Sequence, residues 1–113
     1  ADREGLIVNL LDQRVLRPGP DFFSYSLSKS ALWDATRMLA QALAPRIRVN
    51  AIGPGPSLPS IHQDQAAFDA EVASTLLQRP SSPAQMGAAL RYLIDAWAVT
   101  GQMIAVDSGQ HLS

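Results

Sequence analysis

The sequence predicts an α/β protein with a doubly wound parallel sheet. Three short apolar runs have the length and composition of buried strands, namely residues 5–11, 47–52 and 103–106. Apolar residues recur at helical spacing between them, in stretches at 21–43, 65–77 and from 82 onward. This alternation predicts parallel strand pairs joined by helical crossovers, with helices on the faces of one sheet.

Composition excludes several classes of function. The 113 residues suit one domain at most, and a net charge of −1 provides no concentrated basic face for nucleic acid or an anionic membrane. Without cysteine there is no disulfide framework or thiolate nucleophile, which fits a cytoplasmic protein. No apolar run reaches the roughly 18 residues of a membrane span. His62 and His111 have no partners at ligand spacing, so we expect no metal site.

The first predicted strand ends at a candidate functional residue. The run 5–11 is nearly continuous in apolar side chains, which is typical of a strand buried on both faces. Asp12 is the first residue beyond it. The stretch 17–20 is Arg-Pro-Gly-Pro, which cannot continue a strand or a helix and therefore predicts a loop.

A long amphipathic helix is predicted next. Asp21 is a plausible N-cap, with Ser24 as a second candidate. Its apolar stripe consists of Leu27, Ala31, Leu32, Ala35, Met38, Leu39, Ala42 and Leu43. Pro45 ends the helix. Tyr25 and Lys29 are four residues apart in it, so both side chains project from one face.

The second strand, 47–52, leads into Gly-Pro-Gly-Pro-Ser-Leu-Pro at 53–59. This stretch cannot be regular structure, so we expect a loop at the carboxyl end of the strand. In open α/β sheets ligands bind at that edge.

The remaining chain predicts two helices and a strand. The helix 65–77 is followed by one that opens at Ser82-Pro83, with its buried side formed by Met86, Leu90, Leu93, Ile94 and Trp97. A last strand at 103–106 precedes a polar tail at 107–113.

Several motifs occur together in a recognisable order: Tyr25-Ser26-Leu27-Ser28-Lys29, Arg48-Val49-Asn50, Pro54-Gly55, Thr100-Gly101-Gln102 and Val106-Asp107-Ser108-Gly109. In this order they resemble the C-terminal half of the short-chain dehydrogenase/reductase family, which implies a Rossmann-like fold. Residues 1–113 would then be the C-terminal part of a single Rossmann-like domain whose N-terminal dinucleotide-binding part is absent. We therefore expect the N-terminal half of the same fold, in the same or a separate chain, as a partner.

Asp12 makes the chain resemble one branch of this family more than the others. Most members of the family carry a serine about thirteen residues before the tyrosine, whereas this chain has an aspartate, as the pteridine reductases do. An ionised aspartate only accepts hydrogen bonds, so it suits a substrate with ring nitrogens and an amino group. The resemblance implies NADPH-dependent reduction of a pterin-like substrate, a dihydropteridine or folate.

The resemblance also assigns the catalytic roles. A free tyrosine has a pKa near 10, and an ammonium within about 4–6 Å lowers it. Tyr25 would be the proton donor, while Lys29 would lower the pKa of Tyr25 and bind the nicotinamide ribose hydroxyls. Asp12 and Tyr25 would relay a proton to a pterin ring nitrogen, next to the carbon that receives hydride.

The binding residues follow from the same resemblance. The cofactor-binding set would be Leu11, Tyr25, Lys29, Pro54, Gly55 and Ser57, and the substrate-binding set Asp12, Tyr25 and Pro56. Leu11 is assigned by position alone, Gly55 would leave room for close backbone contact, and Ser57 would offer a hydroxyl to the pyrophosphate. NADH stays open beside NADPH, and family members commonly form tetramers.

Simpler interpretations remain beside these. Tyr25 and Lys29 could be an ordinary surface pair, Asp12 could only cap a turn, and 54–59 could be a rigid connector. Two other functions remain open: a broader carbonyl reductase in which Asp12 is incidental, and a catalytically inactive fragment that acts as an assembly or interaction module.

Overall fold

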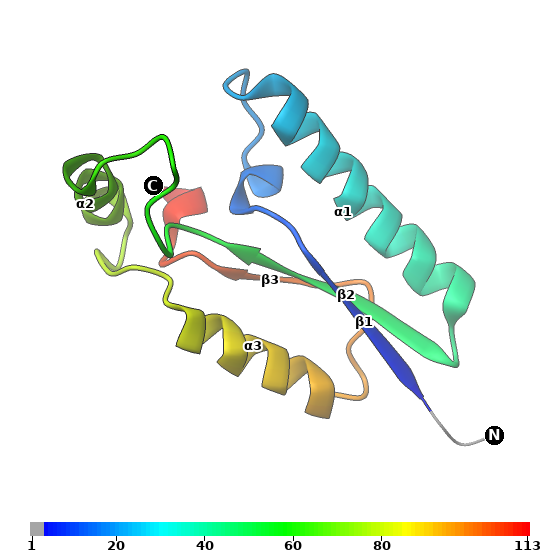
Figure 1. Cartoon of the computed structure of the whole chain (residues 1–113). Helices are drawn as coiled ribbons and strands as arrows, with labels where there is room; N and C mark the ends of the chain where they lie inside the picture. The colour runs from blue at the N-terminus through cyan, green and yellow to red at the C-terminus, as the bar shows by residue number, and fades with distance from the viewer. Residues whose placement is uncertain (1–3) are drawn as a thin grey trace.

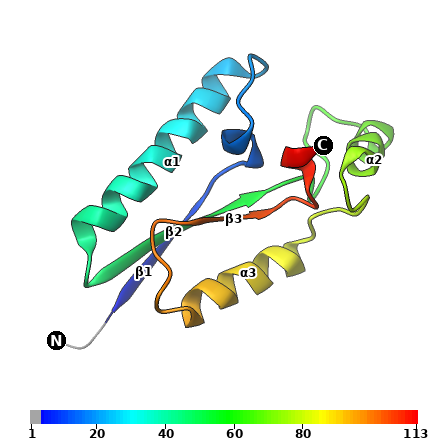
Figure 2. The same cartoon turned by 180° about the vertical axis from the view of Figure 1, so that it is seen from behind.

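The computed structural model describes residues 4–113 and contains one three-stranded parallel sheet. Its strands are β1 (Gly5–Leu10), β2 (Ile47–Pro54) and β3 (Met103–Val106), in the order β1-β2-β3. Helix α1 (Phe23–Leu43) covers one face and α3 (Pro83–Asp95) the other, as Figures 1 and 2 show from opposite sides. The predicted doubly wound α/β architecture is therefore confirmed.

The central strand β2 forms the middle of the core. Val49, Ala51 and Ile52 are almost fully buried, because β2 has a neighbouring strand on each side and a helix on each face. Strand β1 pairs only with β2, and its Ile7 and Leu10 are exposed. The prediction that the first strand is buried on both faces was wrong for the described chain, because Ile7 and Leu10 are exposed. The outer edge of β1 also has no neighbouring strand in residues 4–113.

Helix α1 begins differently from the sequence prediction. Its N-cap is Phe22, in a left-handed conformation with φ 53°, and no side chain caps the helix. The predicted caps Asp21 and Ser24 were therefore wrong. The turn is instead closed by Ser26, whose hydroxyl donates to the main-chain oxygen of Asp21 at 3.2 Å. The predicted end at residue 43 is confirmed.

The buried face of α1 is narrower than the predicted stripe. Thr36 and Ala40 are buried against the sheet, whereas Leu27, Met38 and Leu39 are exposed. Thr36 fixes this orientation, because its hydroxyl accepts from Asn9 of β1 at 3.0 Å and donates to a carbonyl within α1 at 2.8 Å. The stripe therefore combined residues from two helix faces.

Strand β2 runs two residues further than predicted. Gly53 and Pro54 pair with Ala105 and Val106 of β3, although the sequence placed both in the following loop. Proline is tolerated here because it stands at the last position of the strand. Gly55 closes the pairing, since its amide donates to the Val106 carbonyl at 3.0 Å.

The two shorter helices agree with the sequence prediction except in one respect each, the end of α2 and the buried side of α3. Helix α2 (Gln65–Ser74) begins after the cap Asp64 and ends three residues before the predicted position. Helix α3 begins after Ser82, as predicted, and Leu93 lies in the core with Ile52 and Ala89. The predicted buried side of α3 was wrong for three other residues, which are exposed: Leu90, Ile94 and Trp97.

The stretch predicted as a polar tail is folded. Residues Gln110–Leu112 form a 3-10 helix, η2, and Asp107 and Gln110 are buried. The Asp107 carboxylate accepts from the amides of Gly109 and His111 and contacts His111 Nδ1 at 2.6 Å. Gln110 donates to Glu71 of α2 at 2.8 Å. These contacts hold the tail in place, and sequence periodicity gave no sign of them.

Residues 4–113 contain neither a candidate membrane span nor a candidate metal site. No helix in that range combines the length and hydropathy of a membrane span. The same residues contain no group of three His, Asp or Glu side chains placed to hold a metal ion.

Candidate active site

The candidate site lies where β1 ends. Leu11 follows the strand and bonds to β2, its amide donating to the Ile52 carbonyl at 2.8 Å. Asp12 then starts a short 3-10 helix, η1 (Gln13–Leu16), which the sequence did not predict. One carboxylate oxygen of Asp12, Oδ1, accepts from the Arg14 amide at 2.9 Å. Asp12 is thus held at the carboxyl edge of the sheet, where parallel strands present ligand sites.

Tyr25 meets Asp12 at this edge. The Tyr25 hydroxyl donates to Asp12 Oδ2 at 3.1 Å, across thirteen residues of sequence. Asp12 therefore caps a turn with one oxygen and accepts from the phenol with the other. The interpretation of Asp12 as a turn cap holds. Asp12 and Tyr25 are in contact, and the proton relay that the resemblance implies for them stays a prediction.

Lys29 lies one helical turn after Tyr25 on the same face of α1. Its ammonium donates to the Leu10 carbonyl at 3.0 Å and lies 5.8 Å from the centre of the Tyr25 ring. An ammonium has three donors, so two others stay available beside the phenol. The hydrogen bond to Leu10 holds the ammonium at the carboxyl end of β1.

The electrostatics at Tyr25 differ from the expectation. Partial burial raises the pKa of the phenol above its ordinary value, and the negative charge and hydrogen bond of Asp12 raise it further. Only Arg14 acts in the opposite direction. The prediction that Lys29 lowers this pKa was wrong for the described chain, because Asp12 is the group in direct contact with the hydroxyl. At neutral pH Tyr25 is therefore a neutral phenol, able to donate a proton.

Two residues of the predicted binding set take core positions. Leu11 is 3% exposed. Pro56 is also buried, and its carbonyl accepts from the Ser81 amide at 2.8 Å. Their assignment to the nicotinamide and to the substrate stays a prediction, since both side chains pack inside this chain.

Gly55 has a structural reason to be glycine. A Cβ at this position would lie 2.7 Å from both the Cα and the Cβ of Asp107. The space that the sequence interpretation assigned to a cofactor is therefore filled by the chain itself. The residue remains at the end of β2, next to Pro54.

Two polar groups, the Ser57 hydroxyl and the Lys29 ammonium, fit a nicotinamide dinucleotide. The Ser57 hydroxyl is buried and has no hydrogen-bond partner among residues 4–113. Such an unsatisfied group has a free-energy cost that a ligand acceptor would remove. Lys29 retains two donors beside the Tyr25 hydroxyl. The residues present are consistent with the predicted cofactor.

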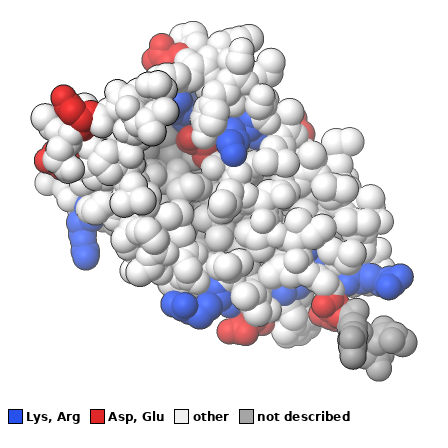
Figure 3. All heavy atoms as spheres, viewed as in Figure 1, with Lys and Arg blue, Asp and Glu red and all other residues white. Residues whose placement is uncertain are grey.

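Two residues next to the pair were missed by sequence reasoning. Arg14 places its guanidinium carbon 4.6 Å from the centre of the Phe22 ring. The sequence contains one sign of their role, which is that both residues lie close to Asp12 and Tyr25 along the chain. Their contact could not be predicted, because it depends on η1, which the sequence did not predict. Figure 3 shows basic and acidic atoms gathered beside a hollow on this face of the molecule.

Comparison with known proteins identifies the family. A family model described as enoyl-(acyl carrier protein) reductase matches residues 1–111. The short-chain dehydrogenase/reductase homolog YusR of Bacillus subtilis is 33% identical over 111 residues, covering 97% of this chain and 86% of that protein. The chain belongs to the short-chain dehydrogenase/reductase family. The family resemblance drawn from the sequence motifs is thereby confirmed.

Other members of the family refine the comparison. A dihydromonapterin reductase of Citrobacter koseri is 32% identical over 106 residues, covering 94% of this chain and 44% of that protein. The crystal structure of FolM alternative dihydrofolate reductase 1 from Brucella suis in complex with NADP matches with a TM-score of 0.97 and 57% identity. That match covers 99% of this chain and 45% of the other. The chain thus spans less than half the length of these reductases, and the predicted Rossmann-like fold is confirmed for this part.

Proposed function

We propose that this chain is the catalytic C-terminal part of an NADPH-dependent short-chain reductase that acts on a pterin-like substrate. One observation carries the proposal: the Tyr25 hydroxyl donates to Asp12 at 3.1 Å at the end of β1, with the Lys29 ammonium beside it. The names of the similar dihydromonapterin and alternative dihydrofolate reductases support the substrate class.

The cofactor would bind beside this triad of side chains. Bound NADPH supplies hydride to the substrate. By resemblance to the family, the two unused donors of Lys29 would bind the ribose hydroxyls. The pyrophosphate would supply the acceptor that the Ser57 hydroxyl lacks among residues 4–113. The two Brucella structures, from Brucella suis and Brucella canis, contain NADP, which favours the phosphorylated cofactor for this chain too.

The proton would come from Tyr25. Its raised pKa keeps the phenol protonated, so it can donate to a ring nitrogen of the substrate. The positive charge of Arg14 then stabilises the phenolate. Asp12 accepts a hydrogen bond from an N–H or amino group of the substrate. After turnover a proton from solvent reaches the Asp12 carboxylate and passes to the Tyr25 phenolate along their shared hydrogen bond.

The partner would be the N-terminal half of the same fold. The outer edge of β1 has no neighbouring strand in the described chain, and the chain spans 45% of the Brucella suis reductase. We further propose a tetramer, since α3 exposes Leu90 and Ile94 and the turn after it exposes Trp97, on a helix that commonly packs between subunits in this family.

The direct test is reduction of a dihydropterin by NADPH, followed as loss of cofactor absorbance with the intact protein that carries this sequence. Tyr25→Phe removes only the hydroxyl, so the rate should fall about 10²- to 10⁴-fold while the fold is retained. Tyr92→Phe is the matched control, because Tyr92 is an exposed residue of α3. Full activity in Tyr25→Phe would contradict the mechanism.

A carbonyl reductase is the second candidate, favoured by the structural role of Asp12 as the cap of η1. Asp12→Ser separates the two functions, because serine also caps a helix but carries no charge. Loss of pterin reduction would support the pterin reductase, and preserved or increased ketone reduction would support the alternative.

An inactive assembly module is the third candidate. One observation favours it: the chain covers 86% of the homolog YusR, so a family member of similar length exists. Intact-mass analysis of the purified protein, together with a titration of NADPH, decides between the candidates. A single 12.1 kDa species that binds no cofactor would support the module.

A further inference from the structure

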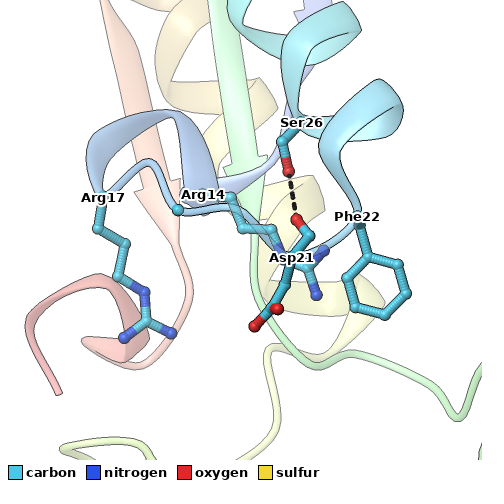
Figure 4. A pocket seen from close by; sticks show the side chains of 6 residues that line it. Arg14, Arg17, Asp21, Phe22 and Ser26 are labelled. Carbon is cyan, nitrogen blue, oxygen red and sulfur yellow. Dashed lines mark hydrogen bonds between the residues drawn. The ribbon is translucent and has the colours of Figure 1, made fainter.

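A small pocket lies beside the Asp12–Tyr25 pair. It has a volume of about 230 Å³ and is lined by Arg14, Arg17, Gly19, Asp21, Phe22 and Ser26. These residues come from η1, the loop after it and the first turn of α1, and Figure 4 shows the two guanidinium groups on either side of Asp21. We call it the Arg14–Arg17 pocket. The Arg14 amide donates to Asp12 at 2.9 Å and the Arg14 charge acts on Tyr25, so the pocket adjoins the candidate catalytic groups.

The charge of this pocket is unbalanced. It contains two guanidinium groups and one carboxylate, and neither guanidinium lies within 4.0 Å of a carboxylate side chain in the part of the chain that the structure describes. Arg17 donates to the main-chain oxygen of Ser113 at 2.9 Å, which uses one of its five donors. Most donors of both side chains therefore remain available for an acceptor.

The aromatic ring of Phe22 completes the site. Phe22 is a non-glycine residue with φ 53°, a strained conformation that occurs preferentially at functional positions. This turn leaves the ring exposed and stacked against Arg14 at 4.6 Å. A guanidinium that stacks on a ring keeps its N–H groups in the plane free to bind a carboxylate at two points.

We infer that the Arg14–Arg17 pocket binds the acidic tail of a substrate whose ring lies at Asp12 and Tyr25, as in a pterin with an aminobenzoyl-glutamate tail. The inference rests on the proposed function and deepens it, because it separates a carboxylate-bearing pterin from one with a neutral polyol tail. Guanidinium groups suit the carboxylates, and Phe22 suits the planar aminobenzoyl ring.

The tail alone provides the first test. p-Aminobenzoyl-glutamate is titrated into the intact protein, and its dissociation constant is measured by NMR or calorimetry. We expect the constant to increase about tenfold or more in Arg14→Gln and Arg17→Gln, and for a ligand with both carboxylates converted to amides. Arg91→Gln, on an exposed position of α3, is the matched control and should bind as the parent does.

The second test is substrate preference. The ratio of kcat/KM for an acidic-tailed dihydropterin to that for a neutral-tailed one should fall about tenfold in Arg14→Gln and Arg17→Gln, through KM. A structural role of either arginine would instead lower both values together and leave the ratio unchanged. An unchanged ratio would overturn the inference.

The two proposals fail in different ways. If the parent protein reduces neither dihydropterin, the proposed function fails, and the tail titration still decides the pocket. If the parent does not bind the tail, or binds it equally after Arg14→Gln and Arg17→Gln, the pocket inference is wrong even where pterin reduction is observed.

Discussion

Asp12 serves the fold and the proposed chemistry with different oxygen atoms. Oδ1 accepts from the Arg14 amide and starts η1, while Oδ2 accepts from the Tyr25 hydroxyl. An ionised carboxylate has about four acceptor positions, so both contacts leave capacity for a substrate N–H. A serine at this position could cap the turn but would carry no charge, which is why the identity of this one residue bears on the substrate.

The titration of Tyr25 is a prediction at this scale. Burial and Asp12 raise its pKa, so the phenol should ionise above pH 10. Asp12→Asn should lower that pKa, because the neighbouring negative charge is removed. The measurement is tyrosinate absorbance against pH in the intact protein, with Tyr25→Phe subtracted to remove the signal of Tyr92.

The same shift affects stability with a defined sign. The folded state holds the phenolic proton more tightly than the unfolded state, so this contribution is complete below pH 10. It is lost as pH rises from there through the folded pKa. Tyr25→Phe should therefore flatten the decrease in unfolding free energy above pH 10, and an identical decrease in both proteins would contradict the assignment.

At the scale of elements, β2 and β3 are joined closely at Gly55. The position next to the Pro54–Val106 pair has no room for a side chain, because Asp107 occupies it at 2.7 Å. Asp107 is itself buried and holds η2 through Gly109 and His111. The end of the second strand thus sets the position of the C-terminal segment.

Gly55→Ala should destabilise the protein by about 1–3 kcal/mol, since the added methyl overlaps main-chain atoms that cannot rotate away. Gly19→Ala is the matched control, because nothing lies within 4 Å of a Cβ there, and its effect should stay within about 0.5 kcal/mol. Urea unfolding of the intact protein measures both. Equal effects of the two substitutions would show that contact with Asp107 is not what requires glycine.

At the scale of the whole molecule, the sheet has an outer edge at β1. The amides of Gly5 and Leu11 donate to carbonyls of residues on and beside β2. Donors alternate in direction along a strand, so the amides of Leu6 and Val8 point to the opposite edge. An uncovered edge of this kind readily pairs with another strand.

We predict that the amides of Leu6 and Val8 exchange slowly with deuterium in the intact protein, because a strand of the N-terminal half covers them. The amide of Ile61, an exposed residue in the loop before α2, is the reference that we expect to exchange fast. Hydrogen exchange read by NMR gives the rates. Exchange at Leu6 and Val8 as fast as at Ile61 would mean that the edge of β1 is bare.

Local sequence patterns were sufficient for much of this molecule. Pro45 and the Ser82-Pro83 pair defined helix ends because proline restricts the backbone wherever it stands. The apolar runs defined three parallel strands, and the Tyr25–Lys29 spacing placed both side chains on one face of α1. Each of these features depends on residues close together in the chain.

Tertiary structure decided what depends on distant partners. The left-handed Phe22, the pairing of Pro54 with Val106 and the buried Asp107 each depend on a segment far away or on a turn with no periodic signal. The raised pKa of Tyr25 has the same origin, because Asp12 reaches the phenol only when β1 and α1 pack together. The sequence by itself determined the elements and the chemical groups, and only packing decided which of those groups touch.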